Sequence, residues 1–216
     1  MTLQEAYDLI DLLLDKADQP YFTNEEKNEF LNQAIMSFIN NHYATFDQEQ
    51  VSRDALMYFV RNLPNKTDAD FDWDSNSFRL PAEYVHIIHF RVSYAGADFV
   101  PAKILGTKDF WDLEFSKDPF NKPTETSPYC YVRHGVDVQA EVKFRPAAVT
   151  GEVDCVVLVF KDYSECFPTP NESLVSSVRE IYQREIIDIA VRKMSGNIES
   201  EATQFQQIEA EQSKSI

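Results

Sequence analysis

The chain has 216 residues, enough for one large domain or two small ones, and its 20 Lys and Arg against 36 Asp and Glu give a formal charge of −16. Hydrophobic residues make up 44% of the chain and charged residues 26%, a globular composition that excludes a disordered or fibrous chain. The acidity disfavours a nucleic-acid-binding protein held by phosphate contacts, because such proteins carry clustered Lys and Arg.

Residues 1–64 have a helical period and are predicted to form an N-terminal helical bundle. Apolar residues recur at spacings of three and four, which gives each helix one apolar stripe. The expected helices cover residues 3–17, 23–41 and 48–62. Thr23 and Glu26 have the spacing of a capping box, in which each side chain bonds a backbone N–H near the helix start. A polar, acidic loop is expected to follow over residues 65–76.

Residues 77–163 change to a period of two, which predicts an antiparallel β domain, either a sandwich or barrel-like. Strands are expected at residues 78–80, 85–94, 99–105, 129–133, 136–145 and 153–160. His134 and Gly135 are expected to form a two-residue hairpin turn between two of these strands. Residues 107–114, which include Phe110 and Trp111, predict a short helix within the β domain.

Residues 168–196 return to a helical period and predict a long helix that packs on the N-terminal helices. Asn171 is a suitable N-cap, and Gly196 lies where the helix is expected to end. Residues 197–216 form a polar tail with few apolar residues, which docks on a partner or stays flexible. The predicted fold class is therefore α+β, with N-terminal helices and a C-terminal long helix bracketing the β domain.

Four alternating acids offer the most distinctive candidate site, and they are Asp68, Asp70, Asp72 and Asp74. They resemble the start of a calcium loop, which also requires Gly at position 6 and Glu at position 12. Counting from Asp70, these positions hold Ser75 and Pro81, and the register from Asp68 fits no better. We expect a solvated acidic loop, while cation binding stays open. Phe71 and Trp73 lie between the acids and suggest that the loop packs against another surface.

His86 and His89 have the spacing of a metal-binding pair on a helix. The segment has a strand pattern, in which residues i and i+3 point to opposite faces. A third ligand is not evident nearby, so we expect two ordinary half-buried histidines rather than a metal site.

The three cysteines, Cys130, Cys155 and Cys166, are an odd and sparse set without C-x-x-C spacing. Such a set indicates neither a disulfide framework nor a zinc ribbon, and we expect reduced thiols. The sequence contains no phosphate-binding, dinucleotide-binding, serine-hydrolase or zinc-protease motif. We therefore expect no catalytic residues, no cofactor and no metal, and a protein that is not an enzyme.

The first residues lack the basic segment of a signal peptide. The longest uninterrupted apolar run, about residues 155–160, is far shorter than the roughly 20 residues of a membrane span. We expect no membrane partner.

Three stretches resemble the head-to-tail adaptor proteins of tailed bacteriophages, also called connector or ring proteins, in particular the crAss-like, short-tailed type. The stretches are Thr23-Asn-Glu-Glu-Lys-Asn-Glu-Phe-Leu-Asn-Gln-Ala, then Phe78-Arg-Leu-Pro-Ala-Glu-Tyr-Val, then Ser127-Pro-Tyr-Cys-Tyr-Val-Arg with Val142-Lys-Phe-Arg-Pro. A long helix opened by Pro-Thr-Pro-Asn-Glu at 168–172 follows them. The resemblance lies in the order of elements over most of the chain.

The resemblance implies a structural virion protein at the head–tail interface, assembled in the cytoplasm of the bacterial host. Copies are expected to form a twelve-fold ring that extends the DNA channel below the portal and seals the packaged head. Residues 197–216 would dock on the portal protein, and further tail ring or tail-fibre proteins would bind the ring. DNA would be a passing polyanion that acidic walls repel.

Uneven charge suggests how copies would pair in such a ring. Residues 1–76 carry 15 acidic and 5 basic side chains, a net charge of −10. We expect this region to face basic residues of the β domain, or those of the C-terminal helix, of a neighbouring copy. The basic residues of that helix are Arg179, Arg184, Arg192 and Lys193.

Two alternative functions stay open at this point. One is another virion protein that completes the tail or attaches its fibres. The other is an acidic DNA mimic that inhibits a DNA-binding protein, which would place its acids along one surface at phosphate-like spacing, whereas the acids here are scattered over three predicted helices.

Overall fold

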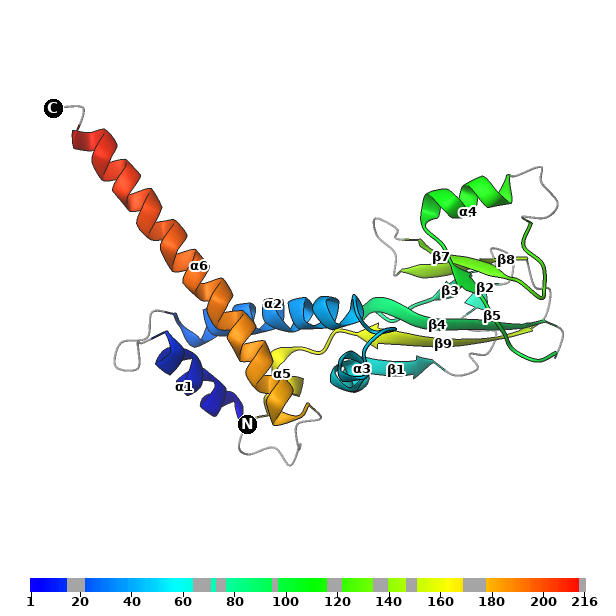
Figure 1. Ribbon diagram of the computed structural model, residues 1–216, viewed down its shortest axis with the longest axis horizontal. Helices are drawn as coiled ribbons and strands as arrows, with labels where there is room; N and C mark the ends of the chain where they lie inside the picture. Colours follow the sequence, from blue (N-terminus) through cyan, green and yellow to red (C-terminus); the bar gives the residue numbers. More distant parts are fainter. Residues whose placement is uncertain are drawn as a thin grey trace. The chain divides into compact units, whose positions relative to one another are not determined.

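The computed structural model describes residues 1–14, 22–63, 71–72, 77–94, 97–115, 122–133, 140–146, 151–168 and 178–213. The chain divides into two compact units (Figure 1). The helical unit comprises residues 1–58 and 161–216, and the β unit comprises residues 59–160. The fold class is α+β, as the sequence predicts, with the β unit inserted between the two parts of the helical unit.

The helical unit contains a long helix from each end of the chain together with shorter ones. Its helices are α1 (Leu3–Leu13), α2 (Asn24–Tyr43), α3 (Gln50–Leu56), α5 (Tyr163–Cys166) and α6 (Glu180–Ser213). The capping box predicted at Thr23 and Glu26 is confirmed, since each side chain bonds the other residue's backbone N–H. Thr2 and Glu5 form a second capping box at the start of α1. Both boxes satisfy N–H groups that the first helical turn leaves unpaired.

The core of the helical unit lies where α2 and α6 contribute apolar side chains from opposite ends of the chain. The fully buried members include Leu31, Ile35, Phe38 and Ile39 of α2, and Ile186, Ile187, Ala190 and Met194 of α6. The rings of Phe38 and Tyr182 lie 6.1 Å apart. Gln183, which is 1% exposed, donates from Nε2 to the backbone oxygen of Cys166 over 2.6 Å and so joins α6 to α5. The two chain ends therefore share one core.

The third predicted helix is shorter than expected. Helix α3 ends at Leu56, a 3-10 turn covers Met57–Phe59, and Val60–Leu63 form strand β1 of the β unit. Strand β1 pairs with a buried central strand, with Leu63 opposite Cys155. The helical spacing of Phe59 and Leu63 was misleading because sheet pairing overrides a weak local preference.

Helix α6 is longer than expected, because it continues through Gly196 to Ser213 instead of ending near residue 196. A glycine in a helix interior costs only about 1 kcal/mol relative to alanine, which does not by itself end a helix. Packing does not require a glycine at position 196, because a Cβ there would meet no atom within 4 Å among the residues described. The predicted N-cap, Asn171, lies outside the described residues.

The described residues of the β unit form two sheets and a helix. The strands are β1 (Val60–Leu63), β2 (Phe71–Asp72), β3 (Ser77–Arg79), β4 (Tyr84–Tyr94), β5 (Val100–Pro101), β6 (Lys103–Ile104), β7 (Tyr129–Arg133), β8 (Glu141–Arg145) and β9 (Gly151–Val159), and the helix is α4 (Thr107–Glu114). The strand orders are β1-β9-β4-β5 and β2-β3-β8-β7-β6. Neighbouring strands are antiparallel except β6 and β7, which are parallel.

The two sheets are open and share one core, as in a sandwich. Phe90 of β4 lies between Phe78 of β3 and Phe144 of β8, with ring centroids 6.4 Å and 6.1 Å away. These three rings are buried, and the same cluster contains alternate residues of β4, β8 and β9. Alternation along each strand therefore places one apolar face of each sheet in the core.

The structure describes part of the predicted acidic loop but not the predicted hairpin turn. The predicted acidic loop contains a short strand, since Phe71 and Asp72 of β2 pair with Phe78 and Ser77 of β3. Strands β7 and β8 pair antiparallel, but the hairpin turn predicted at His134 and Gly135 lies outside the described residues.

A buried ion pair holds α1 against α2. Lys27 Nζ donates to Asp11 Oδ2 over 2.6 Å, with the two side chains 2% and 16% exposed. The same Nζ lies 5.6 Å from the centroid of the Tyr7 ring, and the Tyr7 hydroxyl donates to Asn28 Oδ1. Within the described residues, the other carboxylate oxygen of Asp11 is buried without a hydrogen-bond partner. Among these contacts, only Lys27 carries a charge that balances the carboxylate of Asp11.

We expect Lys27→Met to lower the free energy of unfolding by about 3–5 kcal/mol, because it leaves the Asp11 carboxylate buried without its cation. Urea unfolding followed by circular dichroism measures the change. The double variant Lys27→Met/Asp11→Leu removes both charges and should recover most of the loss. A single variant as stable as the wild-type chain would contradict this account of the pair.

Candidate functional site

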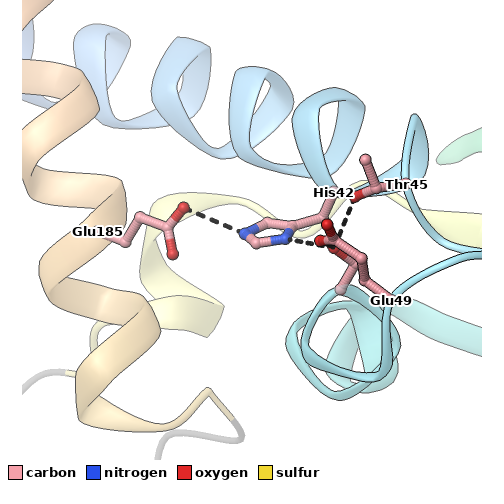
Figure 2. A network of polar contacts seen from close by, with 5 residues as sticks. His42, Thr45, Glu49 and Glu185 are labelled. Carbon is pink, nitrogen blue, oxygen red and sulfur yellow. Dashed lines mark hydrogen bonds and ion pairs between the residues drawn. The ribbon is translucent and has the colours of Figure 1, made fainter.

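A polar network joins three helices inside the helical unit (Figure 2). His42, in the last turn of α2, lies between Glu185 of α6 and Ser52 of α3. Its Nε2 is 3.1 Å from Glu185 Oε1, and its Nδ1 is 3.2 Å from Ser52 Oγ. The network brings together residues that are 143 positions apart in the sequence.

Ser52 is the buried centre of this network. Its side chain is 1% exposed, whereas His42 and Glu185 are 15% and 42% exposed. Ser52 Oγ lies 2.8 Å from Thr45 Oγ1 and donates to Glu49 Oε2 over 3.4 Å. Three neighbours therefore satisfy a hydroxyl that burial would otherwise leave unpaired.

The order carboxylate, imidazole, hydroxyl is that of the catalytic triad of serine hydrolases. A triad needs a serine that gives its proton to histidine and a route by which a substrate carbonyl reaches Oγ. Ser52 has one proton, and while it donates to Glu49, His42 Nδ1 is the donor and not the base. Because Ser52 is buried, a substrate carbonyl also has no route to its Oγ. The geometry thus supports a structural tie between α2, α3 and α6.

The sequence gives no signal for this network. His42 follows two asparagines at the end of α2, and Glu185 is one of many acids in α6. Only the packing of α6 on α2 places the two side chains together, and packing of helices from opposite chain ends cannot be read from a local pattern.

We expect a fluorophosphonate probe to leave Ser52 unmodified in the folded protein, because its Oγ is buried and held by Thr45 and Glu49. Mass spectrometry of the peptide that contains Ser52 measures labelling. A serine hydrolase treated in parallel is the positive control. Stoichiometric labelling that disappears in His42→Ala would contradict the structural role.

The histidine pair predicted on a strand lies in β4, where both side chains are half-buried. The prediction that the two point to opposite faces is wrong. The pairing of β4 with β9 is irregular, so that His86 pairs with Leu158 and His89 with Val156. Partners two residues apart share a face, so an extra residue, Ile88, places both histidines on the face away from the core. Desolvation by burial lowers the pKa of His86.

The described part of the chain contains no group of three or more His, Cys, Asp or Glu residues placed to hold a metal ion. Of the four alternating acids, Asp72 lies in β2, while Asp68, Asp70 and Asp74 lie outside the described residues.

The three cysteines are free thiols and are fully buried. Cys130 and Cys155 belong to the core of the β unit, and Cys166 lies in the helical unit. Burial raises the pKa of each thiol to about 12. Because the thiolate is the nucleophile and the metal ligand, these side chains act as small apolar groups.

We expect the folded protein to react with a chromogenic disulfide reagent at pH 8 far more slowly than the three free thiols of the unfolded chain. A pKa raised from the ordinary value of 9.0 to about 12 lowers the thiolate fraction on the order of 1000-fold, before burial hinders the reagent. The release of absorbing product with and without guanidinium measures this. Because the folded pKa is raised, stability should also fall as the pH rises from about 9 toward 12. Rapid reaction of all three thiols in the native protein would contradict their burial.

Among the residues that the structure describes, no helix is both long enough and apolar enough to cross a membrane.

A scan of the sequence against protein-family models gives no match, and a search of curated proteins gives none either.

Proposed function

We propose that this chain is a structural virion protein that forms a ring between the portal and the tail of a bacteriophage. The supporting observation is the construction of the helical unit, in which α2 packs against α6 and the β unit is inserted between Tyr58 and Lys161. This is the order of elements that the sequence resemblance implies. In this proposal the work of the protein is non-covalent, and copies extend the DNA channel and bind further tail proteins.

The length of α6 supports a docking role for the end of the chain. The helix has 34 residues, roughly 50 Å at 1.5 Å per residue. Its last half is polar in sequence, with only Ala202, Phe205, Ile208 and Ala210 apolar beyond residue 198. A polar helix of this kind gains little from burial within its own chain and is suited to contact with another protein. We assign it to the portal contact.

The distribution of charge supports a channel that does not bind DNA. The helical unit carries 21 acidic and 9 basic residues, a net charge of −12, and the β unit carries 15 and 11, a net charge of −4. The acids of α2, such as Glu25, Glu26 and Glu29, are exposed. Copies arranged in a ring would surround a duplex with carboxylates, which repel phosphate and let the duplex slide.

Large apolar side chains exposed on both units supply surface for contacts between proteins. They are Leu12, Leu13, Val51, Met57 and Ile181 in the helical unit, and Ile104, Trp111 and Phe115 in the β unit. In the proposed ring, neighbouring copies, the portal and tail proteins would bury this surface.

We expect the full chain, mixed with a portal protein encoded in the same genome, to form closed rings with a central opening in negative-stain electron microscopy. The chain should not bind duplex DNA at physiological ionic strength, because its carboxylates repel phosphate. Truncation after residue 196 should abolish portal binding and leave the helical unit folded, as circular dichroism would show.

Three outcomes would contradict the proposal. They are a chain that stays monomeric beside the portal, tight binding of duplex DNA at moderate salt, and turnover of a small molecule. High-affinity binding to a basic host protein would favour the DNA-mimic alternative instead.

A further inference from the structure

The outer face of the five-stranded sheet carries α4 and a pocket beside it. In the ladder of β7 and β8, Tyr131 lies opposite Lys143, and Arg133 follows two residues later on the same face. The neighbouring Cys130 and Val142 point the other way, into the core. Tyr131 also packs against α4, with its ring 4.1 Å from that of Phe110 and 6.0 Å from that of Trp111. Helix α4 therefore supplies an aromatic wall above two basic residues.

The pocket has a volume of about 510 Å³ and is lined by Thr107, Trp111, Tyr131, Val132, Arg133 and Lys143. It combines two cations, a half-exposed indole and a hydroxyl. Trp111 is 41% exposed, and its ring stacks on that of Phe115, which is 75% exposed. A ligand that carries both carboxylates and a flat ring fits this lining, because carboxylates pair with Arg and Lys and rings stack on Trp.

The two cations of the pocket are available for such a ligand. Within the described residues, neither Arg133 nor Lys143 forms an ion pair, although Glu141 is the ladder partner of Arg133. Other basic side chains have partners in their own chain. Arg91 pairs with Asp154, and Arg184 pairs with Glu180 at 2.9 Å.

This contrast extends in part to the basic residues of the C-terminal helix. On the C-terminal helix, Arg184 is bound to Glu180, and Arg192 Nε donates to the backbone oxygen of Asp188 over 3.1 Å. In the β unit, Arg133 and Lys143 lie at a pocket without such partners. Arg179 and Lys193 also form no ion pair among the described residues, so the feature that favours the β unit is that Arg133 and Lys143 lie together in a pocket with aromatic side chains.

The chain itself contains a segment with the matching chemistry. Residues 68–74 read Asp-Ala-Asp-Phe-Asp-Trp-Asp, with four acids, no base and two aromatic residues. Part of this segment is β2, at one edge of the five-stranded sheet, whereas β7 lies next to the opposite edge. Strand β2 and the pocket thus lie at different places on the sheet, and a contact between the segment and the pocket in two copies would be heterologous and could repeat around a ring.

We propose that the pocket of one copy binds residues 68–74 of a neighbouring copy, with aspartates on Arg133 and Lys143 and an aromatic ring against Trp111. The role of this contact in a ring rests on the proposed function, but the contact itself is a property of the purified chain.

Sedimentation velocity of the full chain over a range of concentrations tests the contact. The wild-type chain should self-associate. Arg133→Glu/Lys143→Glu should weaken association by about tenfold or more, because it places like charges across the contact. Asp70→Lys/Asp74→Lys should have the same effect. Lys122→Glu, an exposed charge reversal in the β unit outside the pocket, is the matched control and should associate as the wild type does.

Mixing the two reversed variants gives the sharpest result. In a contact between copies, the acidic pocket of one variant meets the two introduced lysines of the other, and the unchanged basic pocket meets the unchanged acidic segment, so the mixture should associate more strongly than either variant alone. Circular dichroism checks that each variant is folded. A monomeric wild-type chain, association unchanged by the pocket reversal, or a mixture that fails to associate would overturn the inference, and the last result would indicate that the segment does not reach the pocket of another copy.

Electron microscopy separates this inference from the proposed function. Rings that persist with the pocket reversed would leave the proposed function standing and remove the pocket contact. If the mixed variants associate but no rings form on a portal, the contact is supported and the proposed ring is contradicted.

Discussion

The packing of α2 against α6 is the contact on which the helical unit depends, because it joins apolar faces from opposite ends of the chain. Leu31, Ile35 and Phe38 meet the stripe of Ile186, Ala190 and Met194 only after the chain has passed through the β unit and returned. Apolar contact alone allows helices to slide or rotate. The bond from His42 to Glu185 has a fixed partner and sets the position of α6 along α2, and the bond from Gln183 to Cys166 fixes α6 against α5.

Cations are scarce in this chain, so the position of each one carries information. Lys27 balances Asp11 inside the helical unit, and Arg91 pairs with Asp154 on neighbouring strands of the β unit. Such cations are neutralised by their own chain and contribute to folding. Arg133 and Lys143 lie beside a pocket without an ion pair among the described residues, so their positive charge is directed outward. In an acidic protein, cations without an ion pair mark a basic surface that attracts an acidic surface of another copy.

Local patterns predicted the α+β class, the Thr23 capping box and strand β7, because these depend on residues close together in the sequence. Four features depend on distant partners and could not be predicted. Residues 60–63 have helical spacing but become a strand through pairing with β9. An irregularity at Ile88 moves His86 and His89 to one face. The network at His42 needs α6, and the pocket needs α4 placed over β7 and β8, so neither has a motif.

The acidic edge of the five-stranded sheet bears on how copies can meet. Strand β2 has only two residues, and acids flank it in the sequence. Short, charged edge strands resist pairing with the edge of another sheet, since two such edges would bring like charges together. A symmetric contact through residues 68–74 is therefore disfavoured by the same carboxylates that suit the pocket at Arg133 and Lys143. A surface that repels its own copy but matches a different surface of that copy favours heterologous contacts, which are the kind that generates rings.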